Sequence, residues 1–213
     1  MYTGTIWNQM KNKLVQRVFC LRYNCIIVVE LIKGGKFVKA VVVYKSKSGF
    51  AKKYAQWIAE ELQADIYEAS KIDINMLMLY DTIIYGGGLY AIGINGLKTI
   101  TKNFDKLKDK KIVVFATGAT PPRNEDIDKV RTSNFTEEQQ QKIRFFYLRG
   151  GFDYTRLKLI DKVLMNLLKL KIKSKDKNKL IPDEKGMLTA YDKPIDFTRK
   201  KNIEELIMYV KAK

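Results

Sequence analysis

Residues 40–62 decide the fold, and they read AVVVYKSKSGFAKKYAQWIAEEL. The first five residues, 40–44, are a run of apolar side chains, which is typical of a strand buried on both faces of a parallel sheet. Apolar side chains then recur at helical spacing, at Ala51, Tyr54, Ala55, Ile58, Ala59 and Leu62. Ser46-x-Ser48-Gly49-x-Ala51 stands between the two patterns. The stretch predicts a buried strand, a short turn and a helix that begins at once.

The turn has the chemistry of a phosphate site. Backbone N–H groups at the start of a helix have no intrahelical acceptor, and the helix dipole favours negative charge there. Ser46 and Ser48 add hydroxyl donors, and Gly49 lets the backbone approach an anion closely. The sequence has no GxxxxGK[ST] pattern here, so the turn is not a nucleotide-triphosphate loop. An ordinary strand-turn-helix with accidental serines is the alternative.

The spacing Ser-x-Ser-Gly-x-Ala directly after a first strand resembles the FMN phosphate loop of the flavodoxin family. The resemblance implies FMN as the cofactor and electron transfer as the function. It places the flavin phosphate on Ser46, Lys47, Ser48, Gly49, Phe50 and Ala51.

The rest of the chain alternates between strand and helix patterns. Strands are expected at residues 40–44, 64–69, 82–86, 111–117 and 145–148, and helices at 51–62, 72–79, 96–104, from Thr136 and at 202–210. This alternation predicts an α/β fold, a flavodoxin-like doubly wound five-stranded parallel sheet in the order 2-1-3-4-5. A ligand in such a sheet lies beyond the carboxyl ends of strands one and three.

Two glycine-containing loops fall where that ligand would lie, at residues 86–93 and 117–122. The flavodoxin resemblance implies that they grip the isoalloxazine ring, through Gly87, Gly88, Leu89, Tyr90, Ala91, Thr117, Gly118, Ala119 and Thr120. Glycine permits a positive φ and lets a backbone peptide group hydrogen-bond flavin N5, and Tyr90 is suited to stack on the ring.

Two other interpretations of the first loop remain. Gly86 to Gly88 can form a loose turn without a ligand. Residues 86–91 also match the dinucleotide pattern G-x-G-x-x-A. That pattern follows the third strand rather than the first, and no helix pattern starts at Tyr90, so a Rossmann dinucleotide site is disfavoured.

Composition limits the chemistry. The chain has 213 residues and no histidine, which removes the commonest general base and metal ligand. Its two cysteines, Cys20 and Cys25, precede the predicted fold, so we expect neither a disulfide framework nor an iron–sulfur site. Redox chemistry then falls to a bound cofactor, with no catalytic side chain and no metal required. The cysteine usage favours a cytoplasmic location.

The formal charge of +17 departs from the flavodoxin family, whose members are usually acidic. A nucleic-acid surface is one explanation, but the sequence contains none of the usual recognition modules, and we expect no nucleic-acid partner. A lysine-rich composition without functional meaning is a second explanation. An anionic membrane surface is the third.

Residues 1–37 look unlike the rest, and we treat them as an N-terminal extension to a domain at 38–213. They hold no run of about 20 apolar residues that would span a membrane. Lys33-Gly34-Gly35 can be encoded by a bacterial ribosome-binding sequence, and Val38 by an alternative GUG start. We therefore hypothesise that the assigned start lies upstream of the true one. A genuine basic extension is the rival interpretation.

An insert separates the fifth strand from the last helix, at about residues 152–201. Tyr147-Leu-Arg-Gly-Gly151 precedes it, and the arrangement resembles the flavodoxin-like branch that contains the menaquinone-linked protoporphyrinogen IX dehydrogenases. Those enzymes carry an Arg and a His in the loop after strand three, and this chain carries neither there. The resemblance leaves two functions open, an electron carrier that serves a redox partner protein, and a dehydrogenase that passes electrons to a quinone. A pocket lined by Tyr90, Tyr147, Arg149 and residues 152–172 would favour the enzyme.

The insert begins with a cationic amphipathic helix at residues 157–170. Residues 156–179 hold nine basic and two acidic side chains, a local charge of +7. A wide apolar face on a basic helix suits peripheral contact with an anionic membrane. Packing of that face against the domain or a partner protein is the alternative.

Overall fold

The computed structural model describes residues 39–176, 180 and 182–212, and residues 38–213 form one compact unit. The expectations of an N-terminal extension at 1–37 and of an upstream start concern residues outside this description.

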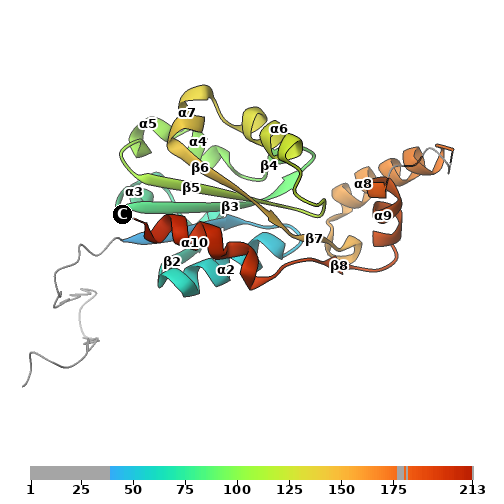
Figure 1. Ribbon diagram of the computed structural model, residues 1–213, viewed down its shortest axis with the longest axis horizontal. Coiled ribbons are helices and arrows are strands. Elements are labelled where there is room, and N and C mark those ends of the chain that lie inside the picture. Colours follow the sequence, from blue (N-terminus) through green and yellow to red (C-terminus); the bar gives the residue numbers. More distant parts are fainter. Residues whose placement is uncertain (1–38, 177–179, 181, 213) are drawn as a thin grey trace, which may run out of the picture. The chain divides into compact units, whose positions relative to one another are not determined.

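Five parallel strands form the centre of the unit (Figure 1). They are β1 (Ala40–Lys45), β2 (Asp65–Glu68), β3 (Thr82–Tyr90), β5 (Lys111–Gly118) and β6 (Ile143–Arg149). Their order is β2-β1-β3-β5-β6, and each neighbouring pair runs parallel. The predicted doubly wound order 2-1-3-4-5 is therefore confirmed.

Helices cover both faces of the sheet (Figure 1). On one face α2 (Phe50–Leu62) and α10 (Glu204–Lys211) bury their apolar sides with Val42, Ile84 and Phe115. The other face carries α3 (Ile74–Met78), α4 (Lys98–Thr101), α5 (Phe104–Leu107), α6 (Asn124–Asn134) and α7 (Glu137–Lys142). Val41 and Val43 face these helices. Because successive strand residues point to opposite faces, the run of valines in β1 serves both cores.

Most of the helices lie where the sequence pattern predicted them, although some boundaries differ. The helix predicted from Thr136 begins with a complete capping box, in which Gln139 N–H donates to Thr136 Oγ1 at 3.3 Å and Thr136 N–H donates to Gln139 Oε1 at 3.2 Å. The single helix expected at 96–104 is instead two short helices, α4 and α5. The Asn103 side chain, which precedes α5, donates to the carbonyl of Thr99. Two short 3₁₀ turns, η2 (Ala69–Lys71) and η5 (Lys200–Ile203), complete the layers.

The third strand is longer than predicted. Gly86 ends the predicted strand, but the expected loop is wrong for Gly87 and Gly88. Gly87 pairs with both β1 and β5, and Gly88 pairs with β5. Packing explains glycine at two of these positions: a Cβ on Gly86 would lie 2.0 Å from a ring carbon of Phe115, and one on Gly87 would lie 2.7 Å from the Asn95 carbonyl oxygen. The chain turns only after Tyr90, into a hairpin with β4 (Gly93–Ile94).

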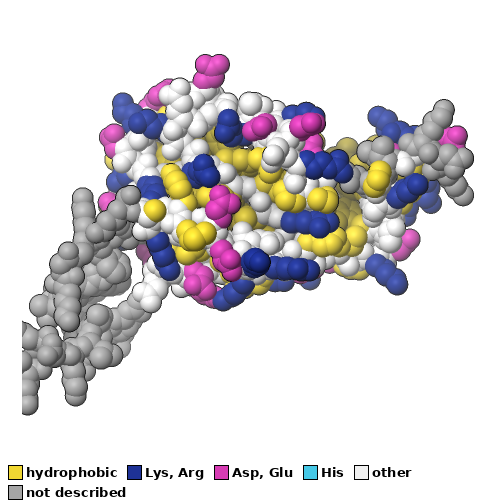
Figure 2. Space-filling model, in the orientation of Figure 1, with side chains coloured by type: hydrophobic (Ala, Val, Ile, Leu, Met, Phe, Trp, Pro, Cys, Tyr) yellow, Lys and Arg dark blue, Asp and Glu magenta, His cyan; other side chains and the backbone are white. Residues whose placement is uncertain are grey.

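The insert after β6 forms a lobe of its own. Its base is a two-stranded antiparallel ribbon of β7 (Gly151–Phe152) and β8 (Ile195–Asp196). Between these strands come η3 (Tyr154–Arg156), α8 (Leu159–Lys173) and α9 (Pro182–Ala190). We call residues 151–196 the insert lobe. Figure 1 shows α8 and α9 beyond one end of the sheet, and Figure 2 shows Lys and Arg side chains on this part of the surface. The amphipathic helix was predicted, whereas α9 and the ribbon were not.

The close packing at Gly86 leads to a stability prediction. Gly86→Ala should lower the free energy of unfolding by about 2–4 kcal/mol, because the new methyl group overlaps a fully buried aromatic ring. Gly88→Ala is the matched control, since a Cβ there would have its nearest neighbour, Thr117 Oγ1, at 3.8 Å. Its effect should stay below about 1 kcal/mol. Urea unfolding followed by circular dichroism measures both. Equal effects of the two substitutions would show that the Phe115 contact is not what requires glycine at 86.

Candidate cofactor site

The turn between β1 and α2 has the geometry of an anion site. Gly49 is the N-cap of α2 with φ +95°, and its N–H donates to Ser46 Oγ at 3.0 Å. The first helical hydrogen bond runs from Lys53 N–H to Gly49 C=O. The N–H groups of Phe50, Ala51 and Lys52 precede that bond and so lack an intrahelical acceptor. The serine hydroxyl therefore shapes the turn, while the helix start presents donors to a ligand.

The insert lobe contacts this turn through ionic side chains. Lys47 Nζ lies 2.7 Å and 3.0 Å from the two carboxylate oxygens of Asp161, which belongs to α8 and is buried. Arg156 Nη1 donates to the carbonyl of Ser48 at 3.4 Å. Neither Asp161 nor Arg156 was among the predicted cofactor residues. One signal was present in the sequence: Asp161 is the only acidic residue of the otherwise basic α8 segment.

The hairpin after β3 forms a second wall. Leu89 and Tyr90 pair with β4, and Ala91 takes a positive φ of 52° in the turn. Tyr90 is half exposed, and its ring centroid lies 4.7 Å from Lys47 Nζ. A cation at that distance is held over the ring face. Tyr90 is thus placed next to the phosphate turn, whereas Gly87 and Gly88 lie further back within the sheet.

The segment after β5 forms the third wall, and β6 holds it in place. Tyr147 Oη donates to the Thr120 carbonyl at 2.8 Å, and Arg149 Nε donates to the Ala119 carbonyl at 3.3 Å. Burial raises the pKa of Tyr147 to about 12, so its hydroxyl remains a neutral donor at ordinary pH. Thr117 is buried at the end of β5, and Gly118 C=O accepts from Gly150 N–H at 2.7 Å.

Sheet register brings these three segments to one edge. Lys45 at the end of β1 is level with Gly87, and Gly88 is level with Thr117 of β5. The residues that follow in each chain segment therefore leave the sheet side by side at its carboxyl edge. The sequence-predicted residues Ser46 to Ala51, Leu89 to Ala91 and Gly118 to Thr120 lie along that edge.

The donor set at this edge fits FMN. A phosphate monoester carries a charge of about −1.5 to −2 at neutral pH and offers acceptor oxygens. The turn offers backbone N–H groups and the Ser46 and Ser48 hydroxyls. Two cations lie beside it, Lys47 paired with Asp161 and Arg156 paired with Asp153. The walls offer an aromatic ring and backbone groups, which suit a flat ring with polar edges.

A cavity of about 370 Å³ adjoins the third wall. It lies between the 119–121 segment and the insert lobe, and it is lined by Ala119, Thr120, Pro121, Arg149, Phe152, Pro182, Glu184, Gly186, Met187, Ala190, Ile195 and Phe197. The guanidinium carbon of Arg149 lies 3.6 Å from the ring centroid of Phe197. The volume is within the range of small-molecule sites. Of the predicted pocket residues, Arg149 and Phe152 line this cavity, whereas Tyr90, Tyr147 and residues 153–172 do not. The residues from α9 and β8 were not predicted.

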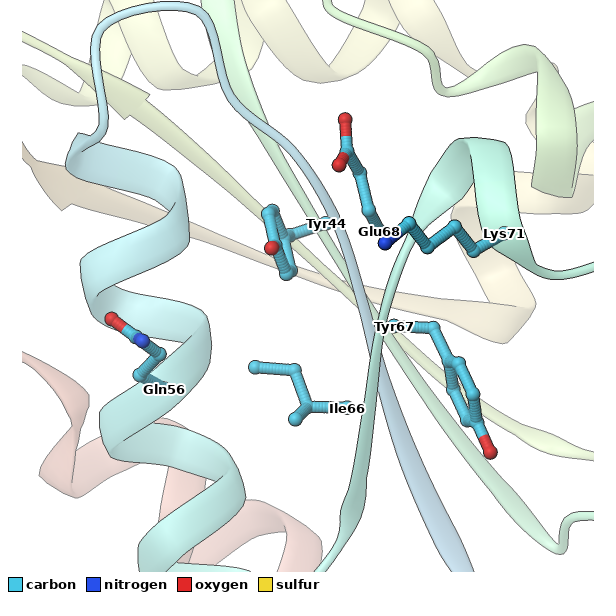
Figure 3. Close-up of a pocket in the computed structure, with 6 residues that line it drawn as sticks. All are labelled: Tyr44, Gln56, Ile66, Tyr67, Glu68 and Lys71. Carbon is cyan, nitrogen blue, oxygen red and sulfur yellow. The ribbon is translucent and has the colours of Figure 1, made fainter.

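A smaller hollow of about 220 Å³ lies elsewhere, at the β2 edge of the sheet. It is lined by Tyr44, Gln56, Ile66, Tyr67, Glu68 and Lys71. Figure 3 shows Gln56 of α2 and Ile66 of β2 on the same side, with Tyr67 directed to the other side of the strand. None of these residues belongs to the three predicted segments, so the hollow is not part of the candidate site.

Comparison with known proteins gives one family and several distant structures. Residues 41–179, more than half of the chain, match the Flavodoxin domain family. An uncharacterized protein from Methanocaldococcus jannaschii is 38% identical over 86 residues, which cover 39% of this chain and 56% of that protein. The chain thus spans about half the length of the curated relative it matches.

Solved structures with similar folds are remote in sequence. A WrbA-like flavodoxin from Agrobacterium tumefaciens is 19% identical, with 59% of this chain and 88% of that chain covered and a TM-score of 0.42. A flavoprotein in complex with FMN from Lactobacillus acidophilus is also 19% identical, with 53% and 92% covered and a TM-score of 0.36. The flavodoxin of Megasphaera elsdenii is 15% identical, with 51% and 84% covered and a TM-score of 0.36.

Proposed function

The chain belongs to the flavodoxin domain family, and on that premise we propose that it is an FMN-binding redox protein that transfers electrons to a partner. One observation carries the proposal. A positive-φ glycine opens α2 and leaves three helix-start N–H groups as donors, at the edge where β1, β3 and β5 end together. Such a turn next to two further walls suits a flavin with a terminal monophosphate.

Each segment has a distinct task in this proposal. Residues 46–51 hold the phosphate through backbone N–H groups and hydroxyls. Tyr90 and the hairpin turn cover one side of the ring, and residues 118–120, fixed by Tyr147 and Arg149, border the other. When bound, FMN supplies the hydride and single-electron chemistry. The protein contributes binding, orientation and exclusion of water, which agrees with a chain that has no histidine.

Cofactor content is the first test. The purified protein should be yellow and carry one FMN per chain. Ser48→Ala combined with Gly49→Val should abolish FMN retention, because valine is strained at φ +95° and would distort the turn. Ser174→Ala combined with Gly186→Val is the matched control, since it changes the same residue types in the insert lobe, where a Cβ on Gly186 meets nothing within 4 Å. Absorbance and chromatography of the heat-released cofactor provide the measurement. Release of FAD, or no flavin binding after reconstitution, would contradict the proposal.

The cavity beside the third wall favours a second function. A flavin-dependent dehydrogenase of the protoporphyrinogen oxidase type needs a substrate site next to the ring, and it passes the electrons on to a quinone. The cavity of about 370 Å³ adjoins Ala119 and Thr120 and is walled by Arg149 and apolar side chains of the insert lobe. Arg149 suits an acidic group on an otherwise apolar substrate. The second proposal therefore gives the insert lobe the role of a substrate wall.

Filling the cavity separates an enzyme from a carrier. Met187→Trp should reduce porphyrinogen oxidation with a menaquinone analogue at least about tenfold, because the indole occupies substrate space. FMN affinity and reduction of a one-electron acceptor should stay within about twofold, since no flavin contact is proposed for Met187. Met208→Trp, at a side chain of α10 that is 65% exposed, is the matched control. If the wild-type protein oxidises no porphyrinogen but exchanges electrons with acceptors, the dehydrogenase function is contradicted and only the carrier function is supported.

The apolar face of α8 supports peripheral contact with an anionic membrane. Seven large apolar side chains of this helix are exposed: Leu159, Ile160, Val163, Leu164, Leu167, Leu168 and Leu170. Packing of the whole face against the domain, the sequence-based alternative, is therefore not what the structure has. Lysines at 158, 162, 169, 171 and 173 flank the face. Within the described part of the chain, no helix combines the length and apolarity needed to cross a bilayer.

Vesicle co-sedimentation tests this contact. The protein should bind vesicles rich in phosphatidylserine but not phosphatidylcholine vesicles, and salt should weaken the binding. Leu164→Asp combined with Leu168→Asp should abolish it without unfolding the protein, because both side chains are exposed. Met78→Asp combined with Leu79→Asp is the control, since these exposed residues lie at α3. Equal sedimentation with both lipids, or unchanged vesicle binding by the α8 variant, would contradict the proposed membrane contact.

A further inference from the structure

Arg156 approaches the phosphate turn from a distant part of the sequence. It ends η3 in the insert lobe, 108 positions after Ser48, whose carbonyl accepts from its Nη1 at 3.4 Å. A Cβ built on Gly49 would lie 3.2 Å from the same nitrogen. The guanidinium therefore lies directly against the turn that opens α2.

The Arg156 side chain is held in this position by Asp153. Arg156 Nε lies 3.0 Å from Asp153 Oδ2, and the other carboxylate oxygen of Asp153 accepts from the N–H and the hydroxyl of Thr155 at 3.0 Å and 2.6 Å. The Thr155 hydroxyl lowers the pKa of the Asp153 carboxyl, which therefore stays ionised at neutral pH and keeps hold of the guanidinium. A guanidinium has five N–H donors in a fixed plane, more than these contacts use.

The other cation at the turn is already neutralised. Lys47 Nζ binds both carboxylate oxygens of Asp161, whose side chain is 8% exposed. That pair fixes the start of α8 against the turn, but its charge is balanced within the protein. Arg156 is also ion-paired, with Asp153, but its planar group lies against the Ser48–Gly49 peptide and has more N–H donors than these contacts use.

We propose that Arg156 is a ligand of the flavin phosphate, so that the insert lobe supplies part of the phosphate site. This inference rests on the proposed binding of FMN. The charge-assisted contact would add to the backbone donors of the turn and would act on the phosphate alone. The insert lobe would then take part in recognising FMN over a flavin without phosphate.

Comparing FMN with riboflavin tests the role of Arg156 directly. Apo-protein is titrated with each flavin, and quenching of flavin fluorescence gives the two dissociation constants. Arg156→Gln should weaken FMN binding about tenfold and leave riboflavin binding within about twofold, because riboflavin lacks the phosphate. Arg156→Lys should fall between wild type and Arg156→Gln, since lysine keeps the charge but loses the planar donor group. Arg144→Gln, at an exposed arginine of β6 paired with Glu205, is the matched control and should change neither constant.

The outcomes are distinguishable. Weakening of FMN binding alone supports the proposal, and so does a shallower salt dependence of FMN binding in Arg156→Gln. Equal weakening of both flavins would overturn it, because Arg156 would then act only by holding the insert lobe in place. Unchanged FMN binding would overturn it as well. If the wild type binds neither flavin, the proposed function itself fails, and the inference falls with it.

Discussion

The parallel pairing of β1 with β3 is the constraint on which the rest of the structure depends. Both strands are buried on both faces, with Val41, Val42 and Val43 beside Ile83, Ile84 and Tyr85. A slip of one residue would exchange the side chains of the two cores, so the packing of both faces specifies the register. That register brings the turn after β1 level with the end of β3. The candidate cofactor site is therefore a consequence of core packing.

The insert lobe is the part of this flavodoxin domain that lies outside the five-stranded sheet and its covering helices. It leaves the sheet through β7, returns through β8, and reaches the phosphate turn through Arg156 and Asp161 between them. The same lobe forms most of the lining of the cavity beside the third wall and exposes the apolar face of α8. The insert lobe therefore contributes to the candidate cofactor site, to the cavity and to the exposed apolar surface.

Several elements show which features a local sequence pattern can predict and which it cannot. The turn after β1 and the capping box at Thr136 were predicted because both arise from residues within six positions of each other. Helix α6 was missed because its apolar content is low, and only Val130 is fully buried along it. Gly87 and Gly88 were assigned to a loop because glycine usually marks turns. The need for glycine at 86 depends on Phe115, which is remote in sequence and packs where a Cβ of Gly86 would be.

The sequence by itself determined the α/β class, the strand order and the turn between β1 and α2, because alternating apolar runs and turn residues act over short distances. It also indicated the three segments that approach the candidate cofactor. Only the tertiary structure decided that Arg156 and Asp161 lie against the turn, that α9 and β8 wall a cavity, and that α8 keeps its apolar face exposed. These contacts join residues far apart in the chain, and such pairs leave no periodic signal in the sequence. These contacts form only when the insert lobe packs onto the edge of the sheet.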